Sequence, residues 1–302
     1  MFQYYDEERK VKSCEPVSIR DFISQPDGDV WGWFNEYFKY GGIPEIHDIV
    51  PYYELQENAK LMEYAESEKE KHLKRIAEGV CEYFCDFNHL YNHRDVKRFF
   101  RAVARSAGGT VSPYKLKCDL LNDEDSVSDL RDNTVKKYLE LLCMNGIAYR
   151  VPVYDPKKAK FKINMSMYYF TDVGLAKAYN GRAYGKRQLY LSLICSELMK
   201  HDVSLYNAFY VTSQLGEDKK PHRATKSVDF VIVDENQVTV AIQVIPKYHT
   251  EEVKENCHAM KLLGPDCRKI IVTEPDEETV SKIRYNCPDN VDVTDIISFL
   301  GR

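Results

Sequence analysis

The side chains best suited to chemistry are lysines in two neighbouring segments of the chain. Lys136 and Lys137 follow Asn133 in a segment with the apolar spacing of a helix, and we expect all three to face outward. The second set lies in a turn and the strand after it: Lys157, Lys158, Lys160 and Lys162. Because ammonium groups neutralise phosphates, both sets predict a contact with DNA. The helix has no outward arginine, the best reader of guanine, so binding should be only weakly sequence-specific.

The same module has a second interpretation, in which it is a protein-interaction or spacer element with solvated lysines. The acidic loop Asp123-Glu124-Asp125 precedes the predicted reading helix and would repel phosphate. The charge distribution favours the DNA contact: residues 94–172 contain 15 Lys/Arg against 10 Asp/Glu, although the 302-residue chain has a formal net charge of −5.

The elements that must position these lysines are three helices and a β-hairpin. The helices are predicted over 96–104, from Ser112 and Pro113 onward, and over 133–145. Residues 148–154 and 161–170 alternate like two strands joined by a turn. Three helices followed by a hairpin is the winged-helix arrangement, a relative of the helix-turn-helix.

The chain on either side of this module has different patterns. Residues 15–50 predict short helices, and 53–90 predict a long charged helix. After residue 180 the order becomes mixed α/β, with helices over 189–200, 251–263 and 277–285, and strands over 204–212, 227–234, 238–245 and 269–273. We therefore expect a mixed α/β protein with a helical segment at 1–92, a winged helix at 93–180 and an α/β/α domain at 181–302.

Several short sequence motifs occur in the order known from one protein family. They are Pro16–Phe22, Phe34–Glu45, Asp132–Leu139, Tyr168–Leu175, and Val228–Val231 with Ala241–Val244. Together they resemble the C-terminal part of a family of archaeal and bacterial AAA-type ATPases. The resemblance implies the end of an ATPase core, a winged helix, and a C-terminal domain like the PD-(D/E)XK nucleases, whose fold is that of restriction endonucleases.

The resemblance also implies a nuclease-like site. Glu197, Asp229 and Gln243 would take the catalytic positions, with Glu197 and Asp229 as ligands of Mg²⁺ or Mn²⁺. Gln243 is a neutral ligand, and Ile245 stands where the catalytic lysine is expected. Lys247 has the same strand parity, but Pro246 intervenes. The degenerate motif favours a non-catalytic DNA-binding or scaffolding role over a metal-dependent nuclease.

The sequence differs from the family at the ATP site. The segment 181–187 has one residue too few between its glycines and ends in arginine, so we expect no phosphate-binding loop and no ATP site. A third interpretation follows, in which the chain docks on a separate ATPase subunit or self-associates. The aromatic cluster Trp31, Trp33, Phe34, Tyr37 and Phe38 would be the docking face or local core.

Cysteine spacing and hydropathy bear on the compartment. The nine cysteines include no Cys-x-x-Cys pair, which favours reduced thiols in a cytoplasmic protein. Two weak zinc sets, Cys257-His258 with Cys267 and Cys81 with Cys85, have too few ligands at the usual spacing. The longest apolar runs are the length of a strand, and no signal peptide is evident, so no membrane partner is expected.

Overall fold

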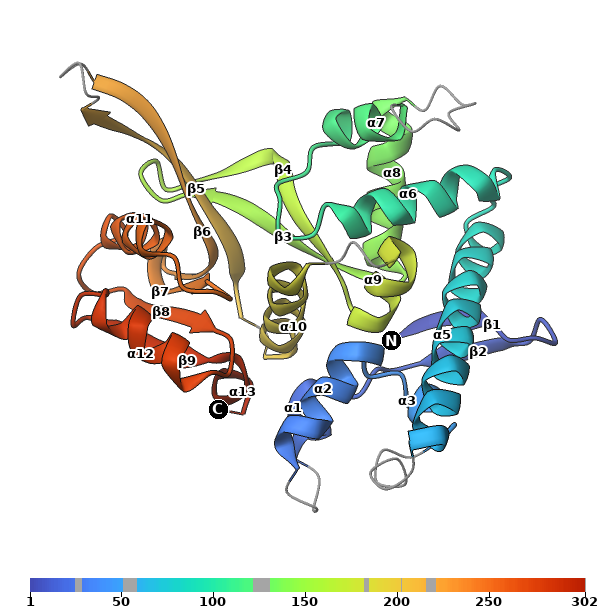
Figure 1. Ribbon diagram of the computed structural model, residues 1–302. Helices are drawn as coiled ribbons and strands as arrows, with labels where there is room; N and C mark the ends of the chain where they lie inside the picture. Colours follow the sequence, from blue (N-terminus) through green and yellow to red (C-terminus); the bar gives the residue numbers. More distant parts are fainter. Residues whose placement is uncertain are drawn as a thin grey trace. The chain divides into compact units, whose positions relative to one another are not determined.

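The computed structural model describes residues 1–24, 29–50, 59–121, 131–181, 185–201, 203–215 and 221–301. The fold is mixed α/β, and its helices and strands are labelled in Figure 1. The chain divides into a first unit, Met1–Arg150 with Tyr168–Glu197, and a second unit, Val151–Met167 with Leu198–Arg302. Among the described residues, no helix is both long and apolar enough to cross a membrane.

The first unit begins with a small hairpin and a set of helices. These are β1 (Phe2–Tyr5), β2 (Val11–Cys14), α1 (Ile19–Ile23), α2 (Val30–Tyr40), α3 (Pro44–His47) and α5 (Ala59–Phe87). Ser18 and Asp29 cap α1 and α2, because their side chains accept hydrogen bonds from backbone N–H groups of the first turns. The long charged helix predicted over 53–90 is confirmed over the residues of α5, whereas the hairpin was not predicted.

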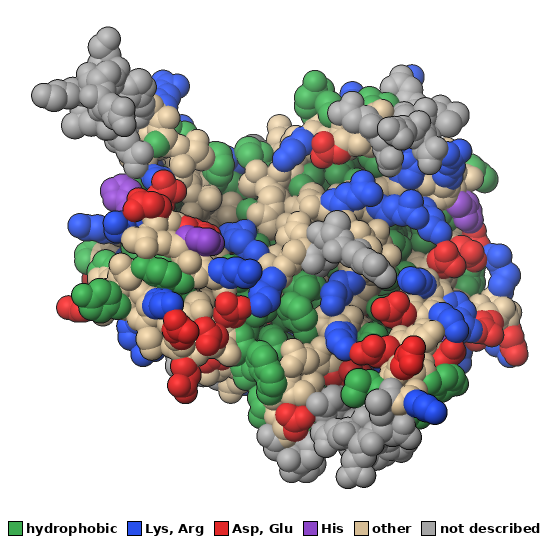
Figure 2. All heavy atoms as spheres, viewed as in Figure 1, with side chains coloured by type: hydrophobic (Ala, Val, Ile, Leu, Met, Phe, Trp, Pro, Cys, Tyr) green, Lys and Arg blue, Asp and Glu red, His purple; other side chains and the backbone are tan. Residues whose placement is uncertain are grey.

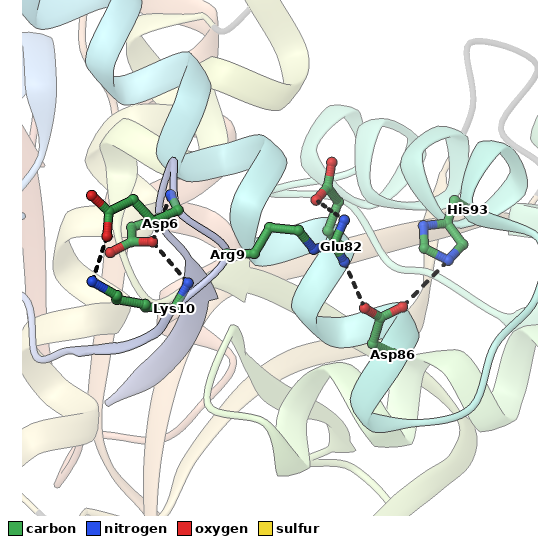
Figure 3. Close-up of polar contacts among 7 residues, drawn as sticks. Asp6, Arg9, Lys10, Glu82, Asp86 and His93 are labelled. Carbon is green, nitrogen blue, oxygen red and sulfur yellow. Dashed lines mark hydrogen bonds and ion pairs between the residues drawn. The ribbon is translucent and has the colours of Figure 1, made fainter.

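The β1–β2 hairpin packs closely on α5. A Cβ at Gly79 of α5 would lie 2.1 Å from the Tyr5 carbonyl oxygen, so the contact requires glycine there. At the hairpin tip, Arg9 forms ion pairs with Asp86 at 3.1 Å and Glu82 at 3.8 Å (Figure 3). Asp86 also lies 3.6 Å from His93, the first residue of the next helix. These exposed pairs orient the chain and contribute little stability.

The three helices predicted for the middle of the chain are confirmed as α6 (His93–Arg105), α7 (Pro113–Leu121) and α8 (Asp132–Met144). The first-turn N–H of Lys115 donates to the Ser112 hydroxyl, the cap expected from a serine before a helix-starting proline. The first unit also contains α9 (Val173–Asn180) and most of α10 (Lys186–Lys200).

A seven-stranded sheet has the strand order β4-β3-β5-β6-β7-β8-β9. Its strands are β3 (Ala148–Asp155), β4 (Lys160–Phe170), β5 (Leu205–Leu215), β6 (Pro221–Asp234), β7 (Gln237–Val244), β8 (Arg268–Thr273) and β9 (Val291–Asp295). Strands β5, β6 and β7 are antiparallel, while β7, β8 and β9 are parallel. Figure 1 shows β5 and β6 as a long paired ribbon that extends past β7.

The parallel strands of the second unit are joined through α11 (Thr250–Lys261) and α12 (Glu277–Tyr285), and α13 (Ile296–Leu300) follows β9. Apolar residues of β5, β6 and β7 form one buried cluster with α11 and β8, including Ala208, Val231, Ala241, Val253 and Ile271, and Ile245 just after β7 joins it. This apolar core stabilises the strands that carry Asp229 and Gln243.

The predicted hairpin forms, but it does not stand apart from the sheet. Val153 and Tyr154 of β3 pair in parallel with Asn207 and Ala208 of β5. As a result the residues around the hairpin turn group with the C-terminal strands, and the two units do not follow the three predicted segments. Pairing between strands this far apart in sequence leaves no signal in local periodicity.

Candidate functional site

The outward face of α8 carries the side chains predicted for DNA contact. Asn133, Lys136 and Lys137 are exposed, and the Lys136 ammonium lies 4.0 Å from Glu140 on the next turn. Sequence reasoning missed Arg131, which is exposed at the N-cap position because the helix begins at Asp132 rather than 133. The start of the helix therefore carries the outward arginine that its interior lacks.

The opposite face of α8 is buried, which fixes the orientation of the polar face. Val135, Leu139 and Leu142 are almost fully buried, as predicted, and Tyr138 packs edge-on against Phe99 of α6. An ion pair of 2.8 Å between Lys117 and Asp132 connects α7 to the first turn of α8. The acidic loop Asp123-Glu124-Asp125 lies outside the described residues.

A second basic face lies on α6. The sequence analysis did not identify it, although the helical spacing of its arginines can be read from the sequence. Arg94, Arg101 and Arg105 are exposed at positions i, i+7 and i+11 of the helix, which share one side. Lys97, between them, is half-buried and pairs with Glu78 at 2.9 Å. Figure 2 shows Lys and Arg side chains gathered where Figure 1 places α6. This face adds positive charge to the three-helix segment.

A hollow of about 610 Å³ opens at the C-terminal end of α6. Arg105, Lys115 and Arg187 line it, with Asp119 as a carboxylate in the wall and Arg98 at its buried side. The guanidinium of Arg98 donates to the Leu120 carbonyl at 2.6 Å. The excess of basic side chains makes this hollow suited to an anionic group such as a phosphate.

The hairpin lysines belong to the second unit and differ in exposure. Lys157, Lys158 and Lys160 are exposed, while Lys162 is half-buried with its ammonium 3.8 Å from the centre of the Phe209 ring. Burial lowers the pKa of Lys162. Since β4 starts at Lys160, Lys158 lies in the turn before the strand. Lys157 donates to the Val211 carbonyl at 3.2 Å.

Asp229 and Gln243 lie on neighbouring strands, β6 and β7, and are buried. The Gln243 Oε1 accepts from the backbone N–H of Asp229 at 3.2 Å, and the Asp229 Oδ2 accepts from the N–H of Val244 at 2.9 Å. Each side chain thus accepts a hydrogen bond from the main chain of the other strand. We call this pair of hydrogen bonds the latch. One oxygen of each side chain, Asp229 Oδ2 and Gln243 Oε1, already accepts a main-chain hydrogen bond.

The other predicted nuclease residues do not complete this pair within the second unit. Glu197 is buried on α10 and belongs to the first unit. Ile245 is fully buried in the core, and its N–H donates to the Val272 carbonyl at 2.9 Å. Lys247 is exposed beyond Val244, where β7 ends, so strand alternation does not place it beside Gln243. Within the described ranges, no group of three His, Cys, Asp or Glu side chains is arranged to hold a metal ion.

Two of the sequence motifs that resemble the AAA-type ATPase family contact each other in the first unit. The Asp172 carboxylate accepts from the N–H of Gly42 at 2.7 Å and from the N–H of Leu175 at 2.9 Å. A Cβ at Gly41 would lie 2.3 Å from the same carboxylate, and one at Gly174 would lie 2.0 Å from the Tyr40 carbonyl. Burial raises the pKa of Asp172, and the N–H donors oppose that shift. The two motifs therefore form a structural junction between α2 and α9.

The aromatic cluster of α2 is mostly core. Phe34 and Tyr37 are buried, and Trp31 is 51% exposed while stacked on Phe34 at 5.9 Å.

In the segment 181–187, Gly181 ends α9 with a φ of 66°, and residues 182–184 lie outside the described part. Cys81 and Cys85 are one helical turn apart in α5, and all nine cysteines are free.

Comparison with known proteins places this geometry in a family without assigning it an activity. No curated protein and no solved structure matches the chain. A protein family described as "Domain of unknown function (DUF8612)" matches residues 32–184, which is just over half of the chain. That stretch includes α6, α7 and α8 with their basic faces and the junction around Asp172. The chain belongs to this DUF8612 family.

Proposed function

We propose that this protein is a non-catalytic DNA-binding or scaffolding protein. The observation that carries the proposal is the exposed basic face of α8, formed by Lys136 and Lys137 beside Asn133 and opposite an apolar buried face, with Arg131 exposed at the N-cap. The basic side of α6 and its hollow add positive charge within the same unit. Phosphate contacts by lysines position a protein on DNA without reading its sequence, so specificity is weak.

The order of helices and strands supports two more specific proposals, a winged helix and a restriction-endonuclease-like domain. Helices α6, α7 and α8 followed by the β3–β4 hairpin favour a winged helix. The resemblance to AAA-type ATPases implies three residues for the catalytic positions of a nuclease-like domain. Glu197, Asp229 and Gln243 lie on α10, β6 and β7 in that order, which supports a restriction-endonuclease-like domain. The free cysteines fit the proposed cytoplasmic location.

The nuclease-like domain is proposed to be inactive because its residues serve the fold. In the latch, Asp229 Oδ2 and Gln243 Oε1 accept hydrogen bonds from the main chain, and Ile245 is part of the core where a lysine would steady the attacking water. These two acceptor oxygens fit a structural role better than a Mg²⁺ or Mn²⁺ site. Docking on a separate ATPase subunit through the exposed Trp31 is the second candidate function.

Native and denaturing gels with labelled single- and double-stranded DNA, run with and without Mn²⁺, test the proposal. We expect a retarded, intact band at low salt, with no dependence on the metal. Metal-dependent cleavage that is lost in Asp229→Ala would overturn the inactive assignment. The absence of both a shift and cleavage would reject DNA binding and favour the docking function.

The latch itself is testable through stability. Asp229→Ala removes the acceptor of the Val244 N–H, a buried group, and we expect a loss of about 1–3 kcal/mol in the free energy of unfolding. Urea denaturation measures this loss, with Asp234→Ala, an exposed residue at the end of the same strand, as the control. An unchanged stability would mean that Asp229 is kept for something other than the fold.

A further inference from the structure

Two cysteines of the second unit come together although they are 30 residues apart in sequence. Cys257 lies on α11, and Cys287 follows the last residue of α12 by two positions. Their sulfur atoms are 3.5 Å apart, within hydrogen-bonding distance for a thiol pair. Cys257 is 7% exposed and Cys287 is half-buried, so the pair lies where a small oxidant can reach it.

The surrounding contacts hold the two helices in this arrangement. The side-chain amide of Asn286 donates to the Tyr248 hydroxyl at 2.9 Å and to the Lys282 carbonyl at 2.9 Å. The Tyr248 hydroxyl lies 2.8 Å from the hydroxyl of Thr250, at the start of α11. The end of α12 is therefore connected to the start of α11 next to the thiols, and little movement is needed to join them.

The two thiols differ in acidity. The hydrogen bond with Cys287 lowers the pKa of Cys257, against the effect of burial. The pKa of Cys287 is raised by the same hydrogen bond and by burial. Cys257 is thus the better nucleophile, because the thiolate is the reactive form, and Cys287 is positioned as the resolving thiol.

From this geometry we propose that Cys257 and Cys287 form a reversible disulfide when a hydroperoxide oxidises the protein. The Cys257 thiolate attacks one peroxide oxygen and the O–O bond breaks, which gives a sulfenic acid on Cys257 and releases hydroxide, or the alkoxide of an organic peroxide. The Cys287 thiol then attacks the sulfenic sulfur, the S–S bond forms and water leaves. Two thiols are oxidised and one peroxide is reduced, and a dithiol reductant reverses the change.

The other cysteines are less suited to this reaction. Cys267 is buried in the same core cluster, where burial raises its pKa. Cys81 and Cys85 are buried in α5, and the pKa of Cys85 is raised by its hydrogen bond with Cys81 and by burial. We therefore expect a disulfide between Cys257 and Cys287 in preference to one between Cys81 and Cys85.

Peptide mapping by mass spectrometry of the full chain tests the proposal, after treatment with hydrogen peroxide and without reductant. We expect one cross-linked peptide pair that contains Cys257 and Cys287, a loss of two hydrogen atoms, and its disappearance with dithiothreitol. Absence of this cross-link in the folded wild-type protein, or a dominant link between Cys81 and Cys85, would overturn the proposal.

Two variants separate the roles of the thiols. In Cys287→Ser the sulfenic acid on Cys257 should persist and be trapped by dimedone, whereas Cys257→Ser should trap none at Cys287. Cys267→Ser is the matched control and should form the cross-link like the wild type. Equal dimedone labelling of both single variants would contradict the assignment of Cys257 as the nucleophile.

Discussion

Replacing Glu36 with glutamine should destabilise the protein by about 3–5 kcal/mol, because it leaves a buried ammonium without its carboxylate. The Glu36 Oε1 lies 2.5 Å from the Lys69 Nζ, and the two side chains are only 6% and 1% exposed. The pair connects α2 to α5, and His47 Nδ1 lies 3.6 Å from the same carboxylate. Urea denaturation followed by circular dichroism measures the loss.

An exposed pair between the same two helices provides the control. Lys39 lies 2.6 Å from Glu66, with side chains 53% and 45% exposed, so Glu66→Gln should cost at most about 1 kcal/mol. The double variant Glu36→Leu/Lys69→Met removes both charges and should recover most of the loss. Equal effects of the Glu36 and Glu66 variants would show that burial does not decide the strength of these pairs.

The contribution of Glu36 should also depend on pH. Burial opposes its ionisation, but the interactions with His47 and Lys69 outweigh burial and lower the pKa of Glu36. A carboxyl with a lowered folded pKa stabilises the fold above its usual pKa and loses that effect as the pH falls through the folded value. The difference in stability between the wild type and Glu36→Gln should therefore shrink in acid, and a difference that stays constant would contradict this assignment.

The second large effect is expected for Gly174→Ala, at the junction of α2 and α9. The new Cβ would lie 2.0 Å from the Tyr40 carbonyl oxygen and 2.9 Å from the Asp172 Oδ1. Neither neighbour moves easily, because Tyr40 ends α2 and the Asp172 carboxylate is held by two N–H groups. We expect a loss near the upper end of the overpacking range, about 3 kcal/mol.

Gly109→Ala is the matched control for this prediction. Its Cβ would meet only the Ser106 carbonyl at 3.4 Å, so the change should stay within about 0.5 kcal/mol. Thermal unfolding of both variants measures the comparison. A Gly174→Ala protein as stable as Gly109→Ala would mean that α9 shifts freely against α2.

Local periodicity predicted the helices of the middle segment and the polar face of α8, because the burial of Val135 and Leu139 follows from a 3.6-residue repeat. It did not predict that β3 joins β5, or that the Phe230↔Ile242 pairing brings Asp229 next to Gln243. Strand register over such separations is decided by packing of the whole sheet.

The candidate site was predictable to the same extent. Lys136 and Lys137 are exposed as the helix spacing required, whereas the packing of Lys162 on Phe209 depends on a strand about 50 residues away. The basic side of α6 was legible as Arg94, Arg101 and Arg105 at helical spacing. Its relevance became evident only with the hollow at the end of that helix.

The salt dependence of DNA affinity tests the central claim most directly. Fluorescence anisotropy would compare the wild type, Lys136→Glu/Lys137→Glu, and the control Lys12→Glu/Lys261→Glu, which changes the net charge equally at exposed positions elsewhere. If α8 binds phosphates, the first double variant should lose affinity and reduce the slope of log K against log salt by about one per lysine, while the control stays close to the wild type. Equal losses in both double variants, or no binding by the wild type at low salt, would contradict DNA binding through α8.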